Sequence, residues 1–124
     1  MTNFYQEILL DHYKNPRNKG TIQSPDFSSG LENPSCGDTI VIQGTVEHDV
    51  VTKLSFSGSG CVISQAAASM LTELCTGKTV DDILALTKDD IIKLLGIQLG
   101  PVRLKCAVLA LQALHKGILE FKKK

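Results

Sequence analysis

The sequence lacks an excess of charge of either sign, a long apolar run and a recognisable leader. Lysine plus arginine and aspartate plus glutamate number 13 each, so the formal net charge is zero. A chain without a basic excess is not expected to bind nucleic acid. No apolar stretch approaches the length of a membrane span, and no basic leader precedes an apolar run at the N-terminus. The sequence therefore predicts a cytoplasmic protein with no membrane segment and no signal peptide.

Internal repeats and low-complexity segments are also missing, which indicates one globular domain over residues 1–124. With 43% apolar residues, the chain can build a core without disulfides. In a reducing compartment, cysteines serve metals or catalysis more often than structural bridges. The four cysteines therefore bear on function: Cys36, Cys61, Cys75 and Cys106.

The first half of the chain combines one helix with short strands. A helix is predicted to run to about Lys14, where Pro16 disfavours its continuation. The segment Asn15–Pro34 is rich in turn-forming residues and is expected to be mostly loop, with one short strand. Alternating apolar residues predict antiparallel strands over Asp38–Val46 and Val50–Ser57.

The second half is predicted to be helical. A helix starting at Cys61 is expected to stop at Gly77, and Thr79 and Thr87 are expected to cap two short helices. The last helix, predicted over Val102–Leu119, is apolar on nearly all sides and should cross the core. The sequence thus predicts an α+β fold: a small antiparallel sheet of about three strands, helices packed on one face, and a long C-terminal core helix.

The rest of the chain is organised around the stretch Phe56–Met70. Gly58 and Gly60 are expected to permit positive φ and to leave the approach to Cys61 uncrowded. A cysteine at a helix N-terminus is favoured as the thiolate, which binds metals and attacks sulfur. A lone cysteine there would be better explained as a small buried hydrophobe, but two other cysteines change that balance.

Cys36, Cys61 and Cys106 all fall at predicted element boundaries, which makes a soft-metal site credible. Their spacing is not that of a zinc knuckle, so spacing alone is a weak signal. Cys75 follows Cys61 by 14 residues on the same predicted helix, about 21 Å away, so one metal cannot hold both. Cys75 is therefore expected to lie in the core or on a flank.

Asp38, two residues after Cys36, can offer a carboxylate as fourth ligand. With iron, this harder donor would be the most exchangeable ligand, and with zinc the set would be tetrahedral. Alternatively, Asp38 makes only a local turn hydrogen bond. Lys105 either offsets the negative charge of the site or faces solvent. Lys14, Arg17 and Lys19 form a separate basic cluster, which either docks an acidic partner or belongs to a solvated loop. The histidines His12 and His115 are not predicted to be ligands.

At these residues the sequence resembles the U-type iron–sulfur cluster assembly proteins, the IscU/SufU/NifU N-terminal family. The resemblance runs from about Phe4 to Lys116. It rests on four ordered motifs: Asp11–Gly20, Asn33–Asp38, Gly58–Cys61 and Pro101–Cys106.

The resemblance implies a scaffold that accepts sulfur from a cysteine desulfurase and assembles a labile [2Fe–2S] cluster for transfer to apo acceptor proteins. It implies cluster ligands at Cys36, Asp38, Cys61 and Cys106, with Zn²⁺ often held in the same place. Cys106 is the candidate for the catalytic, sulfur-accepting residue. The resemblance leaves a homo-oligomeric state open.

Departures from the family pattern keep a second function open. Isc-type members usually have a histidine before the third cysteine, where this chain has Lys105, as in Suf-type members. Those resemble zinc-dependent sulfurtransferases that relay persulfide sulfur. However, Suf-type members usually carry an insertion before the last helix, which this chain lacks. The chaperone-binding Leu-Pro-Pro-Val-Lys motif reads Leu99–Arg103 with glycine at its second position. We expect a scaffold, with a zinc-dependent sulfurtransferase as the alternative; a structural zinc module and a Cys–His hydrolase are disfavoured.

Overall fold

The computed structural model describes residues 4–34 and 37–124. The chain forms helices and strands in the order α1 (Phe4–Lys14), β1 (Phe27–Asn33), β2 (Asp38–Glu47), β3 (Val50–Ser59), α2 (Val62–Cys75), α3 (Val80–Leu84), α4 (Lys88–Leu95) and α5 (Pro101–Lys122).

The three strands form an antiparallel meander in the order β1-β2-β3. Asn33 pairs with Asp38 to close the first connection. His48 and Asp49 have φ values of 52° and 64°, which suit the two-residue turn between β2 and β3. The predicted strands are confirmed, including a short one before Pro34, and β3 continues two residues beyond the predicted Ser57.

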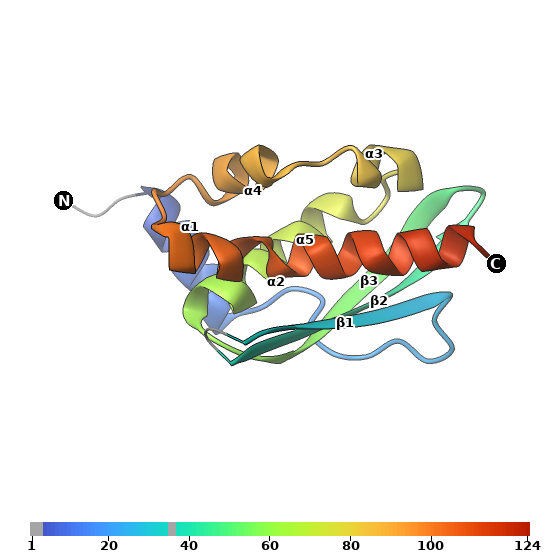
Figure 1. Cartoon of the computed structure of the whole chain (residues 1–124), viewed down its shortest axis with the longest axis horizontal. Coiled ribbons are helices and arrows are strands. Elements are labelled where there is room, and N and C mark those ends of the chain that lie inside the picture. Colours follow the sequence, from blue (N-terminus) through green and yellow to red (C-terminus); the bar gives the residue numbers. More distant parts are fainter. Residues whose placement is uncertain (1–3, 35–36) are drawn as a thin grey trace.

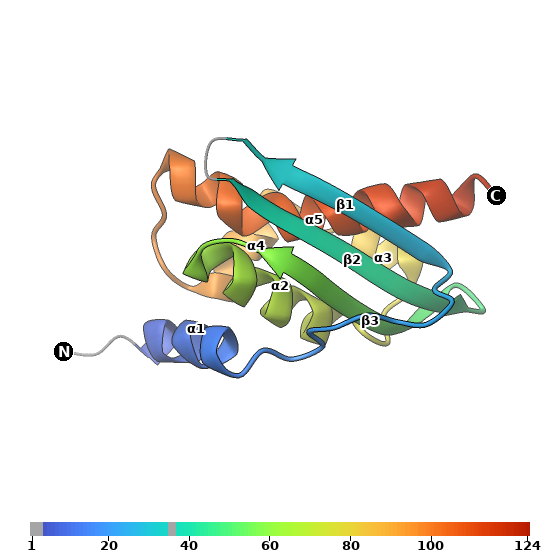
Figure 2. The ribbon, with the colours of Figure 1, turned by 90° about the horizontal axis from the view of Figure 1, so that it is seen from below.

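All helices lie on one face of the sheet, as predicted (Figures 1 and 2). Helices α2 and α5 pack against the strands, α3 and α4 lie on the far side of α2 and α5, and α1 lies beside α2. Inward positions of β2 alternate with half-buried ones, so Ile40 and Ile42 are fully buried under the helices. Among the described residues, no helix covers the opposite face of the sheet (Figure 2).

The long last helix lies in the core, as its apolar composition predicts. Pro101 occupies its first turn, where a missing N–H costs nothing. Leu109, Leu114 and Ile118 are buried along its length. Its N-terminal end comes to the same end of the molecule as the starts of α2 and β2 (Figure 1).

The predicted helix boundaries on α3 and α4 are confirmed. Thr79 accepts a hydrogen bond from Asp82 N, and Thr87 forms a full capping box with Asp90. Gly96 ends α4 in the left-handed conformation, with φ of 68°. Within the described residues, no helix is long and apolar enough to cross a membrane.

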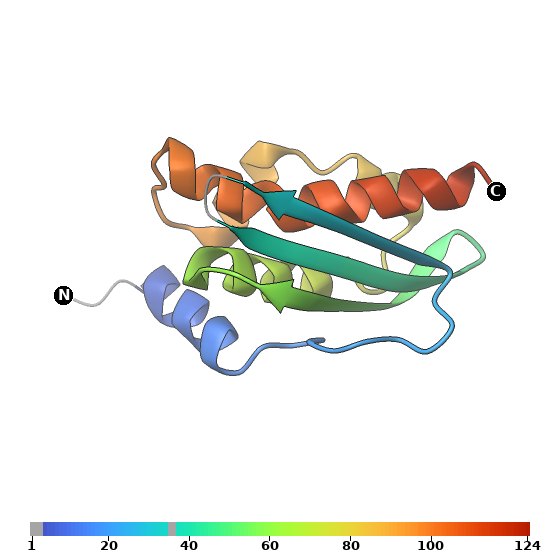
Figure 3. The ribbon, with the colours of Figure 1, turned by 60° about the horizontal axis from the view of Figure 1, so that its bottom comes forward.

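The loop after α1 covers one edge of the sheet. Phe56 N donates to Asn18 O, and Gly20 N donates to Phe56 O, so this loop pairs with β3 (Figure 3). Loop residues then reach β2, where Ile22 N donates to the Gln43 side chain. This loop therefore shields the backbone of the edge strand β3 from pairing with a strand of another chain.

Candidate metal centre

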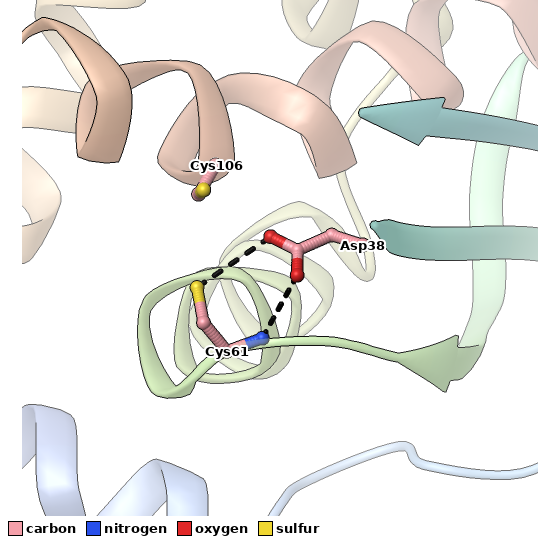
Figure 4. Close-up of side chains that lie close together, drawn as sticks. All are labelled: Asp38, Cys61 and Cys106. Carbon is pink, nitrogen blue, oxygen red and sulfur yellow. Dashed lines mark hydrogen bonds between the residues drawn. The ribbon is translucent and has the colours of Figure 1, made fainter. Parts of the chain in front are cut away.

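Three of the four predicted ligands come together at one end of the molecule. Asp38, Cys61 and Cys106 each offer an atom, and these atoms lie within 4.8 Å of one another. They come from β2, from the start of α2 and from α5, so tertiary folding alone joins them (Figure 4). A carboxylate with two thiols is a donor set that fits zinc or iron. Cys36, the fourth predicted ligand, lies outside the described residues.

Asp38 anchors this arrangement. It is the first residue of β2, and its side chain is only 2% exposed. Its Oδ1 accepts a hydrogen bond from Cys61 N at 3.0 Å, and its Oδ2 lies 3.5 Å from Cys61 Sγ. The carboxylate thus sits at the N-terminus of α2, where the helix dipole favours negative charge. Instead of the local turn hydrogen bond that the sequence left open, Asp38 bonds a residue 23 positions away.

Cys61 is the N-cap of α2, and the helix begins at Val62, one residue after the predicted start. Its backbone is extended, and its carbonyl accepts the first helical hydrogen bond from Gln65 N. Ser64 Oγ lies 3.8 Å from the sulfur and donates to the Cys61 carbonyl. The thiol is therefore oriented by local contacts yet remains exposed to solvent.

The two glycines before Cys61 act in different ways. Gly58 has φ of 122° and approaches Thr39 so closely that a Cβ would lie 2.1 Å from its carbonyl oxygen. Gly60 does not have positive φ, contrary to expectation; instead it leaves room for the site. A Cβ on Gly60 would lie 2.7 Å from Asp38 Oδ1 and 2.5 Å from Ser64 Oγ. The close approach of Asp38 to α2 therefore requires a glycine.

Cys106 is buried in the second turn of α5, with 2% of its surface exposed. Its sulfur accepts a hydrogen bond from Asn33 Nδ2 at 3.6 Å. Asn33 was not among the predicted site residues. The alternation of side chains along a strand could have identified it. Phe27 and Ser29 of β1 face the helices, and Asn33, an even number of residues further on, faces the same side.

Cys75 lies at the opposite end of α2 from Cys61, as predicted. It is fully buried, and burial raises the pKa of its thiol to about 11. This cysteine behaves as a core residue. It offers a matched control for substitutions at Cys61, on the same helix.

A pocket of about 600 Å³ opens beside the two thiols. Both Cys61 and Cys106 line it, together with apolar side chains of α1, α2 and α5 and with Arg103. Lys105 faces elsewhere: it is exposed and borders a second hollow with Glu32 and Pro34. Of the two basic residues before Cys106, only Arg103 lines the pocket that contains the thiols.

The histidines make other contacts. His115 Nε2 lies 2.7 Å from the carbonyl oxygen of Ile83. His12 is buried, and its Nδ1 lies 2.8 Å from Ser69 Oγ. Burial, helped by the Arg17 charge, lowers the pKa of His12 below its ordinary value. Among the described residues, neither histidine belongs to the group of Asp38, Cys61 and Cys106 whose ligand atoms converge.

Arg17 joins His12 in a network that ties α1 to α2. Its backbone N donates to Ser69 Oγ, and its guanidinium contacts Asp11 at 2.7 Å and Glu73 at 3.8 Å. The hydrogen bond from Arg17 holds the pKa of Asp11 below its usual range. The loop cluster that the sequence left open as a docking site therefore has its arginine committed within the chain.

Comparison with known proteins agrees with this architecture. Residues 4–124 match the NifU-like N terminal domain, and the chain belongs to that family. It is 37% identical over 131 residues to the zinc-dependent sulfurtransferase SufU of Bacillus subtilis, covering 92% of this chain and 88% of the relative. It is 34% identical over 124 residues to the iron-sulfur cluster assembly scaffold protein IscU of Escherichia coli, covering 97% and 95%.

Solved structures share the fold. A crystal structure of a hypothetical protein superposes with a TM-score of 0.82 at 32% identity, covering 93% of this chain and 96% of the other. A putative iron-sulfur cluster assembly scaffold protein for the SUF system from Fervidobacterium islandicum superposes with a TM-score of 0.81 at 23% identity, covering 90% and 94%. The second likeness shows the fold alone.

Proposed function

We propose that this chain is an iron–sulfur cluster assembly scaffold. It accepts sulfur from a cysteine desulfurase, assembles a labile [2Fe–2S] cluster and transfers that cluster to apo acceptor proteins. The observation that carries the proposal is the convergence of Asp38, Cys61 and Cys106 within 4.8 Å, in a chain of this family. Cys36 is the fourth ligand in the proposal. The relatives named as scaffolds support the same activity.

The donor set suits a cluster that must leave. Thiolates bind iron strongly, whereas a carboxylate is a harder donor and exchanges more readily. Asp38 already accepts a hydrogen bond from Cys61 N, which competes with a metal for its lone pairs. Asp38 is therefore the ligand proposed to open first when an acceptor protein takes the cluster.

The sulfur-accepting residue is proposed to be Cys106. Its thiolate attacks the terminal sulfur of the desulfurase persulfide; the new S–S bond forms on Cys106 as the donor S–S bond breaks. The donor cysteine leaves as a thiolate and Cys106 carries the persulfide, so no outside oxidant is needed. Cys106 lines the pocket beside Cys61, which offers the donor sulfur a route to this otherwise buried thiol.

A zinc-dependent sulfurtransferase is the second candidate. It is favoured by the likeness to SufU of Bacillus subtilis, which is named as one. In that function the same residues would hold zinc, which lowers the proton affinity of bound thiols and keeps them nucleophilic. The short connection between α4 and α5, residues 96–100, favours the scaffold because Suf-type members usually carry an insertion there.

Anaerobic reconstitution distinguishes the two functions. The protein is incubated with ferrous iron, cysteine and a cognate desulfurase, and visible absorption and metal content are measured. A scaffold is expected to develop a cluster chromophore that moves to an apo-ferredoxin. Firmly held zinc, no chromophore and faster desulfurase turnover would establish the sulfurtransferase instead.

The role of Asp38 has its own test. Asp38→Ala is expected to assemble a cluster but to release it more slowly to the apo-ferredoxin, because the exchangeable ligand is gone. An Asp38→Ala protein that transfers clusters at the parent rate would refute this role.

We further propose that residues 1–124 form one non-enzymatic assembly domain working in the cytoplasm, where the thiols Cys61, Cys75 and Cys106 stay free.

A further inference from the structure

We infer that Asn33 is a positioning residue for the metal centre: its side-chain amide holds the Cys106 sulfur and reduces the electron density that this sulfur donates to a bound metal. The inference rests on the proposed function, because it concerns the same site. It starts from the hydrogen bond between Asn33 Nδ2 and Cys106 Sγ, at 3.6 Å between two buried side chains.

The position of Asn33 is unusual for its residue type. It ends β1 on the side facing the helices and is only 6% exposed, where an apolar side chain would serve packing better. A buried amide is tolerated only where it is hydrogen-bonded. Cys106 supplies an acceptor from α5, 73 residues away in the sequence. The bond thus joins the end of β1 to the helix that carries Cys106.

Asn33 also closes the connection in which Cys36 falls. It pairs with Asp38 across the β1–β2 ladder, and its carbonyl accepts a hydrogen bond from Gly37 N at 2.8 Å. One residue therefore contacts the turn next to Asp38 through its backbone and Cys106 through its side chain. This double contact sets where the Cys106 sulfur lies relative to Asp38.

A hydrogen bond to a metal-bound sulfur has measurable consequences. It withdraws electron density from the sulfur, so charge transfer from sulfur to metal requires more energy and a cluster becomes easier to reduce. It also orients the ligand. Partners of this kind typically change metal affinity by about 10–100-fold when removed. A residue that only stabilised the turn would change none of these spectral properties.

The test titrates the apo-protein with Co²⁺, whose charge-transfer band reports the sulfur ligands directly. Asn33→Ala is expected to shift this band to lower energy because the sulfur donates more electron density. It should also bind Co²⁺ about 10-fold more weakly because the sulfur is no longer held in position. The matched control is Asn18→Ala, which removes a partly buried asparagine bond to Thr72 at 3.3 Å, away from Cys106. This control is expected to lower thermal stability while leaving the band and the affinity unchanged.

Two further measurements keep the inference testable if Asn33→Ala does not fold. Asn33→Asp keeps the shape of the side chain and loses the N–H donor, so it should reproduce the red shift. In the parent protein loaded with ¹¹³Cd, the Asn33 side-chain amide proton should couple to the metal through the N–H···S bond. An unchanged Co²⁺ band in whichever Asn33 variant folds, or no such coupling in the parent, would overturn the inference. A parent protein that binds neither metal would overturn the proposed function itself, which is a distinguishable result.

Discussion

Two polar clusters lie along α2, and they differ in how their charges are balanced. The donor cluster at the N-terminal end consists of Asp38, Cys61 and Cys106; the α1 network further along consists of Asp11, His12, Arg17, Ser69 and Glu73. In the α1 network, one guanidinium meets two carboxylates. In the donor cluster, three groups that are neutral or negative converge and would repel one another once ionised. The first arrangement contains its own cation, whereas the second is a donor set that fits a metal ion.

This difference shows that a sequence motif alone does not reveal whether its residues bind a ligand or stabilise the fold. The stretches Asp11–Gly20 and Asn33–Asp38 both carry polar residues, and both are among the motifs on which the resemblance to the family rests. In the structure, however, its residues fasten α1 and the following loop to α2 and β3. Substitutions in the two clusters should therefore separate metal binding from stability.

The largest expected effect is on metal binding, from Cys61→Ser. Removing a ligand should weaken zinc or cobalt binding by more than the ~10–100-fold typical of outer partners. The control is Cys75→Ser, at the other end of the same helix. It should retain metal binding and lose about 1–3 kcal/mol of stability, because a hydroxyl replaces a fully buried thiol. Metal titration followed by urea unfolding measures both effects. Equal loss of metal binding in the two variants would contradict the separation.

Gly60→Ala should affect both properties. Its Cβ would lie 2.7 Å from Asp38 Oδ1 and would displace the carboxylate from the donor cluster. We expect metal affinity to fall about 10-fold and stability by about 1–3 kcal/mol from overpacking. Gly100→Ala is the matched control, because no heavy atom lies within 4 Å of its added Cβ. Retention of parent affinity in Gly60→Ala would show that the carboxylate position does not matter for binding.

Ser69→Ala should affect stability alone. Ser69 is fully buried, contacts the His12 ring and accepts a hydrogen bond from Arg17 N. Its loss removes the acceptor of the part-buried Arg17 N–H and the partner of the buried His12 Nδ1, which should cost about 1–3 kcal/mol. Urea unfolding measures the loss and a cobalt titration checks that affinity is unchanged; exposed Ser28→Ala serves as control. A weaker metal site in Ser69→Ala would mean that the two clusters are coupled.

The smallest expected effect is the pH dependence of stability. The pKa of His12 is lowered from its ordinary value of 6.5, first by burial and then by the Arg17 charge, against weaker attraction from Glu73 and Asp11. The unfolded state therefore binds the proton more readily. The stabilisation is complete above the ordinary value and is lost as the pH falls below it toward the lowered value.

The urea concentration at the unfolding midpoint should accordingly decrease as the pH is lowered from about 7.5 to about 5.5, an interval that spans the ordinary pKa of histidine. His12→Gln, which cannot titrate, should show a flatter dependence over the same interval. An equal slope in the two proteins would assign the pH dependence to other groups.

Local sequence patterns predicted most of the fold because their causes are local. Alternation in β2 and β3 reflects a sheet with one covered face, and the caps at Thr79 and Thr87 use residues three positions apart. The prediction for Cys75 was correct for a similar reason: helix geometry alone separates it from Cys61. The start of α2 lies one residue after the predicted start at Cys61. The sequence pattern does not distinguish an N-cap residue from the first helical residue.

The sequence by itself predicted the elements and their order, and it put forward Cys36, Asp38, Cys61 and Cys106 as candidate ligands. Only the tertiary structure decided that Asp38 accepts a hydrogen bond from Cys61 N, that Gly60 makes room for it and that Asn33 reaches Cys106. Those contacts join residues on different elements, up to 73 positions apart. Their geometry depends on how α2 and α5 pack on the sheet, which no local periodicity encodes.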